Sequence, residues 1–196
     1  MSIQYTNVAN LLPETKLRMY PTKVINIIGG PGCGKSMFSA AMVLYLHLHS
    51  KTVETIPDHV KALVWQRNFE VLKNQYFLAQ RQFEMLNLLD GQVQFLVTES
   101  SLSQALYYNE HYEPNICDVG KTRTQILKWQ GMYDEVNILV ERGEKRYVRA
   151  GRFQEEEQAR AIDRGLRDLL DRESIPYTTL APDITAINAF AASLVQ

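Results

Sequence analysis

Short apolar runs alternate along this chain with longer segments that repeat apolar residues at helical spacing. The first run, residues 22–28, is rich in β-branched side chains and stops at a glycine-rich loop, so it predicts a buried strand. Similar runs predict four more strands, at residues 52–56, 92–97, 133–140 and 176–180. The order of these segments predicts an α/β protein, with five strands in a parallel sheet and helices on both of its faces.

The segments between the predicted strands carry helical patterns. A helix is expected over residues 35–49, and residues 58–89 predict two helices with a break near residues 67–68. Residues 154–172 predict an amphipathic helix with a charged outer face. A last helix is expected from about Asp183.

One segment differs from the helices around it. Residues 109–122 contain Pro114, Gly120 and many polar side chains. Proline and glycine both interrupt regular structure, and long loops in compact domains often carry function. This segment therefore predicts a long functional loop.

Length and charge narrow the class of protein. The chain has 196 residues, and we expect a lead-in over residues 1–21 followed by one domain over residues 22–196. A formal net charge of −1 lacks the basic excess of a general nucleic-acid binder, so a surface for a polyanion must be local. Its two cysteines predict no disulfide framework and suit the reducing cytoplasm. We expect no signal peptide, transmembrane segment or membrane partner.

The glycine-rich loop after the first strand carries the strongest motif. It fits the pattern G-x-x-x-x-G-K-[ST] and opens a predicted helix, the context that a phosphate-binding loop requires. Backbone N–H groups of such a loop bind phosphates, its lysine reaches the β- and γ-phosphates, and its serine binds Mg²⁺. The motif predicts ATP and Mg²⁺ as cofactors, bound through Gly29, Gly30, Pro31, Gly32, Cys33, Gly34, Lys35 and Ser36.

An acidic residue on a neighbouring strand is needed to orient the magnesium ion or its water. Glu99 follows the third predicted strand, where this residue should fall. We therefore predict Ser36 and Glu99 as the metal-binding residues. The alternative for Glu99 is a structural charge at the N-terminus of the next helix.

A basic segment follows the fourth predicted strand. Its arginines, set between glycines, are typical of a lid over residues 142–153 that closes on the transferred phosphoryl group. Arg149 and Arg152 are three residues apart, so one turn of helix places both on one side, and we predict both as catalytic. The alternative is a solvated basic hairpin. Its cations are Arg142, Lys145, Arg146, Arg149 and Arg152.

Carboxylates near the second strand predict the chemistry of the phosphate acceptor. Glu54 and Asp58 lie where kinases with this loop begin the acceptor pocket. Carboxylates suit a hydroxyl that must be oriented and deprotonated, whereas a phosphate acceptor would favour cations. Either residue is a candidate base, and the alternative for Asp58 is an ordinary role at the start of a helix.

Three tyrosines adjoin the polar segment 109–122. Tyr107, Tyr108 and Tyr112 are candidates to stack on a nucleobase, and the alternative is that they pack in the core.

With the loop, the acid and the basic segment in place, residues 22–190 resemble the small P-loop kinases that include thymidylate and nicotinamide riboside kinases. More narrowly, residues 53–65, 96–102 and 147–154 look like phage-encoded kinases of this group, some of which act on 5-hydroxymethyluracil already in DNA. The resemblance implies a three-layer P-loop kinase fold with strand order 2-3-1-4-5 and an arginine-bearing lid. The family usually has Asp where this chain has Glu99.

What the resemblance implies for activity is transfer of the ATP γ-phosphate to the hydroxymethyl oxygen of the base. That reaction is a step in thymine hypermodification, which protects bacteriophage DNA from restriction, and it would take place in the host cell cytoplasm. The resemblance also implies that residues 181–183 flank the adenine of ATP.

DNA as substrate requires a local basic surface. Residues 121–152 contain eight cations and four acids, a local balance of +4. A base in a duplex would also have to be flipped out to reach the phosphate loop.

Two other functions remain open at this point. A kinase of a free nucleotide or nucleoside agrees with the same motifs, because the carboxylates do not separate an alcohol on a DNA base from one on a free nucleoside. A regulatory NTP-binding switch or ATPase without a small acceptor is the alternative of another class.

Overall fold

Five parallel strands form a single sheet in the order β2-β3-β1-β4-β5. The computed structural model describes residues 17–143, 147–148 and 154–195, which include every strand of this sheet. The predicted fold class and strand order are confirmed. The strands are β1 (Lys23–Ile28), β2 (Val53–Ile56), β3 (Phe95–Thr98), β4 (Asp134–Val140) and β5 (Thr178–Leu180).

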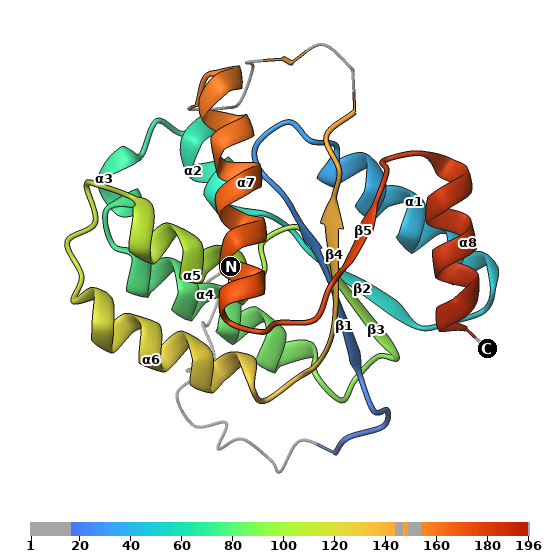
Figure 1. Ribbon diagram of the computed structural model, residues 1–196. Coiled ribbons are helices and arrows are strands. Elements are labelled where there is room, and N and C mark those ends of the chain that lie inside the picture. Colours follow the sequence, from blue (N-terminus) through green and yellow to red (C-terminus); the bar gives the residue numbers. More distant parts are fainter. Residues whose placement is uncertain (1–16, 144–146, 149–153, 196) are drawn as a thin grey trace, which may run out of the picture.

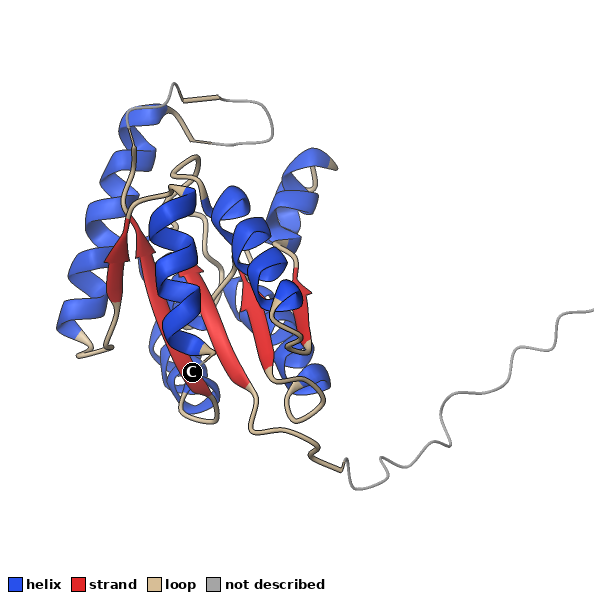
Figure 2. Cartoon of the chain, turned by 90° about the vertical axis from the view of Figure 1, so that its right-hand side faces the viewer, coloured by secondary structure: helices blue, strands red, loops and turns tan. Residues whose placement is uncertain are grey.

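Helices cover both faces of the sheet and make three layers (Figures 1 and 2). One face carries α1 (Lys35–Leu48) and α8 (Ile184–Leu194). The opposite face carries α4 (Gln75–Leu89), α5 (Leu102–His111), α6 (Val119–Gln130) and α7 (Glu156–Arg172). Two short helices, α2 (His59–Trp65) and α3 (Phe69–Leu72), connect β2 to α4.

Alternating side chains of the central strand enter two separate cores. Ile25 and Ile27 of β1 are fully buried against the α1 and α8 layer, and Val24 and Ile28 are fully buried in the opposite layer. Because successive side chains of a strand point to opposite faces, an unbroken apolar run is the pattern of a strand covered on both sides. The unbroken apolar run that predicted β1 is therefore also explained by its position at the centre of the sheet.

Two predicted segments differ in the structure. Residues 58–89 form three helices, because a second break at Lys73 and Asn74 follows the predicted break at residues 67–68. The loop predicted over residues 109–122 is shorter in the structure, residues 112–118, because α5 continues to His111 and α6 begins at Val119.

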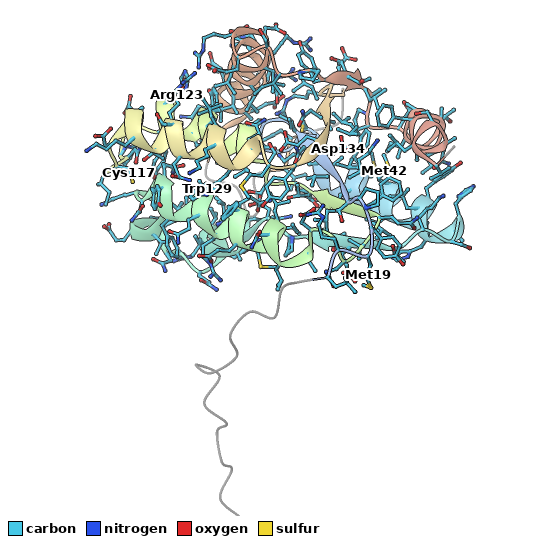
Figure 3. All side chains as sticks on the ribbon, turned by 90° about the horizontal axis from the view of Figure 1, so that it is seen from below. Met19, Met42, Cys117, Arg123, Trp129 and Asp134 are labelled. Atoms are coloured by element: carbon cyan, nitrogen blue, oxygen red, sulfur yellow. The ribbon has the colours of Figure 1, made fainter. Side chains whose placement is uncertain are left out.

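Side-chain capping and one apolar face explain helix α6. The Asp118 carboxylate accepts a hydrogen bond from the backbone N–H of Lys121, which starts the helix in spite of the nearby glycine. Ile126 and Trp129 are buried, and Trp129, labelled in Figure 3, stacks on Phe83 of α4 with ring centroids 4.8 Å apart. Of the segment that suggested a loop, residues 119–122 form the first turn of this helix, where Lys121 is exposed and Thr122 is buried.

A group of polar side chains is buried beneath α6 on this face of the sheet. Asn26 of β1 donates to Asn137 of β4 at 2.8 Å, and Gln130 donates to the Glu135 carboxylate at 3.0 Å. Desolvation raises the pKa of Glu135, and hydrogen bonds from these amides only partly oppose that effect. A half-buried carboxylate in this setting costs stability whenever it is ionised.

We expect Glu135→Gln to become progressively more stabilising, relative to the original protein, as pH rises. The folded pKa of Glu135 lies above its unfolded value, so the folded state holds its proton more tightly and loses stability as pH rises through that interval. Glutamine carries no such proton and still offers an oxygen to Gln130. Urea unfolding between pH 4.5 and pH 8 measures the difference, with Glu113→Gln at an exposed position as the control. A difference in unfolding free energy between Glu135→Gln and the original protein that stays constant with pH would contradict the expectation.

Candidate active site

The phosphate loop lies between the end of β1 and the start of α1 (Figure 1). Gly34 has φ +111°, and a Cβ there would lie 3.0 Å from Pro182, so a glycine is needed on both counts. The Lys35 ammonium donates to the carbonyl oxygens of Gly29 and Gly30 at 2.7 and 3.1 Å. This places the lysine across the concave side of the loop. Pro182, from the segment expected to flank the adenine, lies beside the loop.

Ser36 and Glu99 come together from two neighbouring elements. The Ser36 hydroxyl, in the first turn of α1, donates to the Glu99 carboxylate at 2.6 Å, and Glu99 follows β3, which pairs with β1. Helix α5 is capped instead by the Ser101 hydroxyl, which accepts from the N–H of Gln104. The alternative role for Glu99, as a charge at the start of α5, therefore has less support.

The donor set around Ser36 fits magnesium. Hydroxyl and carboxylate oxygens are the ligands that Mg²⁺ prefers, and it is usually held by one or two carboxylates together with substrate phosphates. Among the described residues, no group of three or more His, Cys, Asp or Glu side chains is placed to hold a metal ion. Ser36 and Glu99 would thus hold the ion with the phosphates of ATP.

We expect Glu99→Gln to raise the Mg²⁺ concentration needed for half-maximal turnover by about 10–100-fold. Glutamine keeps the oxygen that accepts from Ser36 but removes the negative charge that favours a divalent cation. A magnesium titration of the rate at saturating ATP measures this. Glu84→Gln, on the exposed side of α4, is the control, and an unchanged magnesium requirement in Glu99→Gln would argue against the assignment.

A cavity of about 370 Å³ extends from the phosphate loop toward α2 and α4. Lys35, Ser36 and Glu99 line one end of it, and Asp58 and His59 line it from the start of α2. Apolar and amide side chains complete the wall. They include Val60, Val64, Leu72, Gln75, Leu78, Gln82, Gln104 and Ala105.

Asp58 has a structural role and also faces the cavity. One of its carboxylate oxygens caps α2 by accepting from the N–H groups of Val60 and Lys61, at 3.0 and 3.3 Å. Desolvation raises the pKa of Tyr108, and the Asp58 charge adds to the effect, so the tyrosine remains a hydrogen-bond donor in the same cavity. Both roles weighed for Asp58, helix cap and acceptor-site carboxylate, are compatible with this position.

His59 is a second titratable group at this end of the cavity. Desolvation lowers its pKa, and the nearby Asp58 charge only partly opposes this, so the ring is neutral at pH 7. Its Nε2 atom is buried and has no hydrogen-bond partner among the described residues. A neutral imidazole can accept a proton, so the site holds two possible bases.

Of the other candidate residues, some line this cavity and some do not. Glu54 is exposed on β2, the edge strand, and does not line the cavity. Tyr108 and Tyr112 line it, whereas Tyr107 is buried against α7 and stacks on His111 with 4.4 Å between ring centroids. Arg149 and Arg152, with most of the predicted lid, lie outside the described residues.

Sequence reasoning missed three contributions to the site. Gln82 and Gln104 line the cavity from α4 and α5, and Asp163 of α7 accepts a hydrogen bond from the N–H of Gly30 at 2.7 Å. The glutamines had no motif to mark them. Asp163 had a weak signal, as an acid close to the buried stripe of α7 rather than on its outer face.

Two solved structures share this fold. A structure of NadR protein in complex with NAD and AMP-PNP matches with a TM-score of 0.59 and 11% identity over 88% of this chain. This chain spans only 49% of the NadR chain. The structure of deoxyadenosine kinase from M.mycoides with bound dATP matches with a TM-score of 0.56 and 15% identity, over 89% of this chain and 99% of that one. At these identities the likeness establishes the fold.

No family model and no curated protein sequence matches the chain. Within the part of the chain that the structure describes, no helix has the length and apolar character needed to cross a membrane.

Proposed function

We propose that this protein is an ATP-dependent kinase that transfers the γ-phosphate to a hydroxyl acceptor. The observation that carries the proposal is a single cavity that joins Lys35, Ser36 and Glu99 at the phosphate loop to the Asp58 carboxylate on α2. A switch or simple ATPase needs only the first of these two ends. The fold shared with a deoxyadenosine kinase supports the same function.

The phosphate end would bind ATP and stabilise the charge of the reacting group. Backbone N–H groups of the loop and the N-terminus of α1 would bind its phosphates, and Lys35 would leave the Gly29 and Gly30 carbonyls to contact the β- and γ-phosphate oxygens. Magnesium, held by Ser36 and Glu99, would supply neutralising charge between the phosphates. We propose Arg149 and Arg152 as further cations for the transferred group.

The acceptor end would orient and deprotonate a hydroxyl group. Its oxygen attacks the γ-phosphorus, the bond from that phosphorus to the β–γ bridging oxygen breaks, and ADP leaves. The hydroxyl proton passes to the Asp58 carboxylate and then to solvent. The hydrogen bonds from the N–H groups of Val60 and Lys61 hold the Asp58 carboxylate in place at the start of α2, where it can accept this proton.

The charge of the cavity favours a neutral acceptor. Among the described residues that line it, Lys35 and Lys61 are the cations, and Lys61 is exposed to solvent. An acceptor phosphate would need cations beyond the one that serves ATP. A nucleoside or a base that carries a hydroxyl group suits the site better than a nucleoside monophosphate.

We propose the hydroxymethyl group of 5-hydroxymethyluracil in DNA as the acceptor. Its support is the resemblance of residues 53–65 and 96–102 to phage kinases, together with the position of Asp58 and Glu99 from those stretches in one cavity. A kinase of a free nucleoside is the second candidate. It is favoured by the match to nearly the whole length of a deoxyadenosine kinase.

A transfer assay with γ-labelled ATP and Mg²⁺ separates these functions. The acceptors are duplex DNA with 5-hydroxymethyluracil, unmodified duplex, free nucleosides and nucleoside monophosphates. We expect label on the modified duplex and none on the unmodified one. Label on free nucleosides alone would favour the second candidate, and ATP hydrolysis without a labelled acceptor would favour a regulatory ATPase.

A further inference from the structure

Two charged residues that do not line the cavity bind the backbone of the phosphate loop at Gly30 and Pro31. Asp163 of α7 accepts from the N–H of Gly30 at 2.7 Å through one carboxylate oxygen and from the Arg142 guanidinium at 2.6 Å through the other. Arg142, just after β4, also donates to the Pro31 carbonyl oxygen at 2.9 Å. The four groups form one connected network behind the loop.

Because the peptide bond is planar, the contact between Arg142 and the Pro31 carbonyl also orients the N–H of the next residue, Gly32. In a trans peptide, the C=O of one residue and the N–H of the next point in opposite directions. Because Arg142 binds the Pro31 carbonyl, the N–H of Gly32 is turned away from Arg142. Gly32 lines the cavity, so its N–H is directed to the side where phosphate binds.

The close packing of α7 on the loop makes the arrangement rigid. A Cβ on Gly30 would lie 2.6 Å from the Ala159 carbonyl oxygen and 2.6 Å from the Asp163 carboxylate, so this contact requires a glycine. The side chains of Arg142 and Asp163 are 9% and 21% exposed. An ion pair with this burial and both carboxylate oxygens engaged is costly to break on one side only.

This geometry differs from the expectation that Arg142 belongs to a lid that closes on the phosphoryl group. Its guanidinium is already bound to Asp163 and Pro31, on the outer side of the loop. Its position therefore suits a contact with the loop backbone better than a contact with the transferred phosphate.

We propose that Arg142 and Asp163 are positioning residues of the ATP site, which orient the backbone N–H donors of the phosphate loop from behind. The inference rests on the proposed function only in requiring that the loop binds ATP. It adds two residues that act through Gly30 and Pro31 rather than on the substrate. Preorganised donors bind phosphate without reorganisation at the moment of reaction.

Substitutions of the pair test this proposal. We expect Asp163→Ala and Arg142→Ala each to lower kcat/KM for ATP by about 10²-fold, the scale of a misplaced catalytic group, with an unchanged KM for the acceptor. The double variant should be no worse than Asp163→Ala, because both substitutions remove the same network. Asp168→Ala, exposed on the same helix, is the matched control and should match the original protein.

A more conservative substitution tests the proposal even if the alanine variants fold poorly. Arg142→Lys keeps a cation beside Asp163, but its single ammonium does not reproduce the fork that serves Asp163 and Pro31 together. It should melt within a few degrees of the original protein and still bind a fluorescent ATP analogue about tenfold more weakly. A merely structural role would lower the melting temperature and leave affinity for the analogue unchanged.

Direct binding of the analogue also separates this inference from the proposed function. If the original protein binds it and Asp163→Ala and Arg142→Lys bind it within twofold as well, the positioning role is overturned. If the original protein does not bind it, the ATP site itself and this inference are both overturned. An equal increase in the KM values for ATP and acceptor would also overturn the positioning role, since it would indicate general damage to the cavity.

Discussion

Lys35→Ala should reduce kcat for phosphoryl transfer by about 10²–10³-fold, the scale for removing one donor that stabilises charge in a transition state. The Lys35 ammonium lies on the cavity side of the phosphate loop, bound to the Gly29 and Gly30 carbonyls. Alanine leaves the glycine backbone in place but removes this positive charge. Initial rates with γ-labelled ATP and saturating acceptor measure the loss.

Two controls make the Lys35 result specific. Lys51→Ala removes a lysine from the segment before β2, away from the loop, and should retain full activity. Thermal melting should show that Lys35→Ala remains folded, because the side chain is only partly buried. Full turnover in folded Lys35→Ala would refute the assignment of the phosphate loop.

Asp58→Asn should lower kcat by about 10²–10⁴-fold, the range for loss of a general base, while KM for ATP stays near its original value. Asparagine caps a helix about as well as aspartate, so the start of α2 should be preserved. The substitution therefore removes the capacity to take a proton and leaves the structural role. Steady-state kinetics with both substrates varied, together with a melting curve, measure the two roles separately.

Comparison with neighbouring carboxylate and imidazole variants identifies the base. Glu54→Gln lies on the exposed edge strand outside the cavity and should match the original protein. His59→Gln removes the other possible proton acceptor and should keep most of the activity if Asp58 is the base. A large loss in His59→Gln with little loss in Asp58→Asn would assign the base to the imidazole instead.

The elements predicted well are those whose signal is local. The β-branched run of β1, the glycines that follow it and the periodic helix α1 are neighbours in sequence, so each supports the next. Glu99 was placed from its position after β3, and its contact with Ser36 agrees with that placement. In a parallel sheet, residues that follow adjacent strands necessarily meet at one edge.

The elements predicted poorly depend on contacts between distant segments. The predicted loop extended too far because Gly120 and the polar residues beside it belong to the start of α6, and Trp129 of this helix has a partner only when α4 lies beside it. Glu54 and Asp58 were equal candidates in sequence, yet only Asp58 lies past the end of the strand, where the chain turns over the cavity.

By itself, the sequence determined that this protein has the motif of a phosphate loop in a parallel α/β sheet, because glycine conformation and apolar periodicity are properties of short segments. Only the tertiary structure decided that Asp58 shares a cavity with Lys35, and that Arg142 and Asp163 hold the loop from behind. These groups lie on different elements, far apart along the chain. Their distances follow from how helices pack on the sheet, which no local pattern of residues encodes.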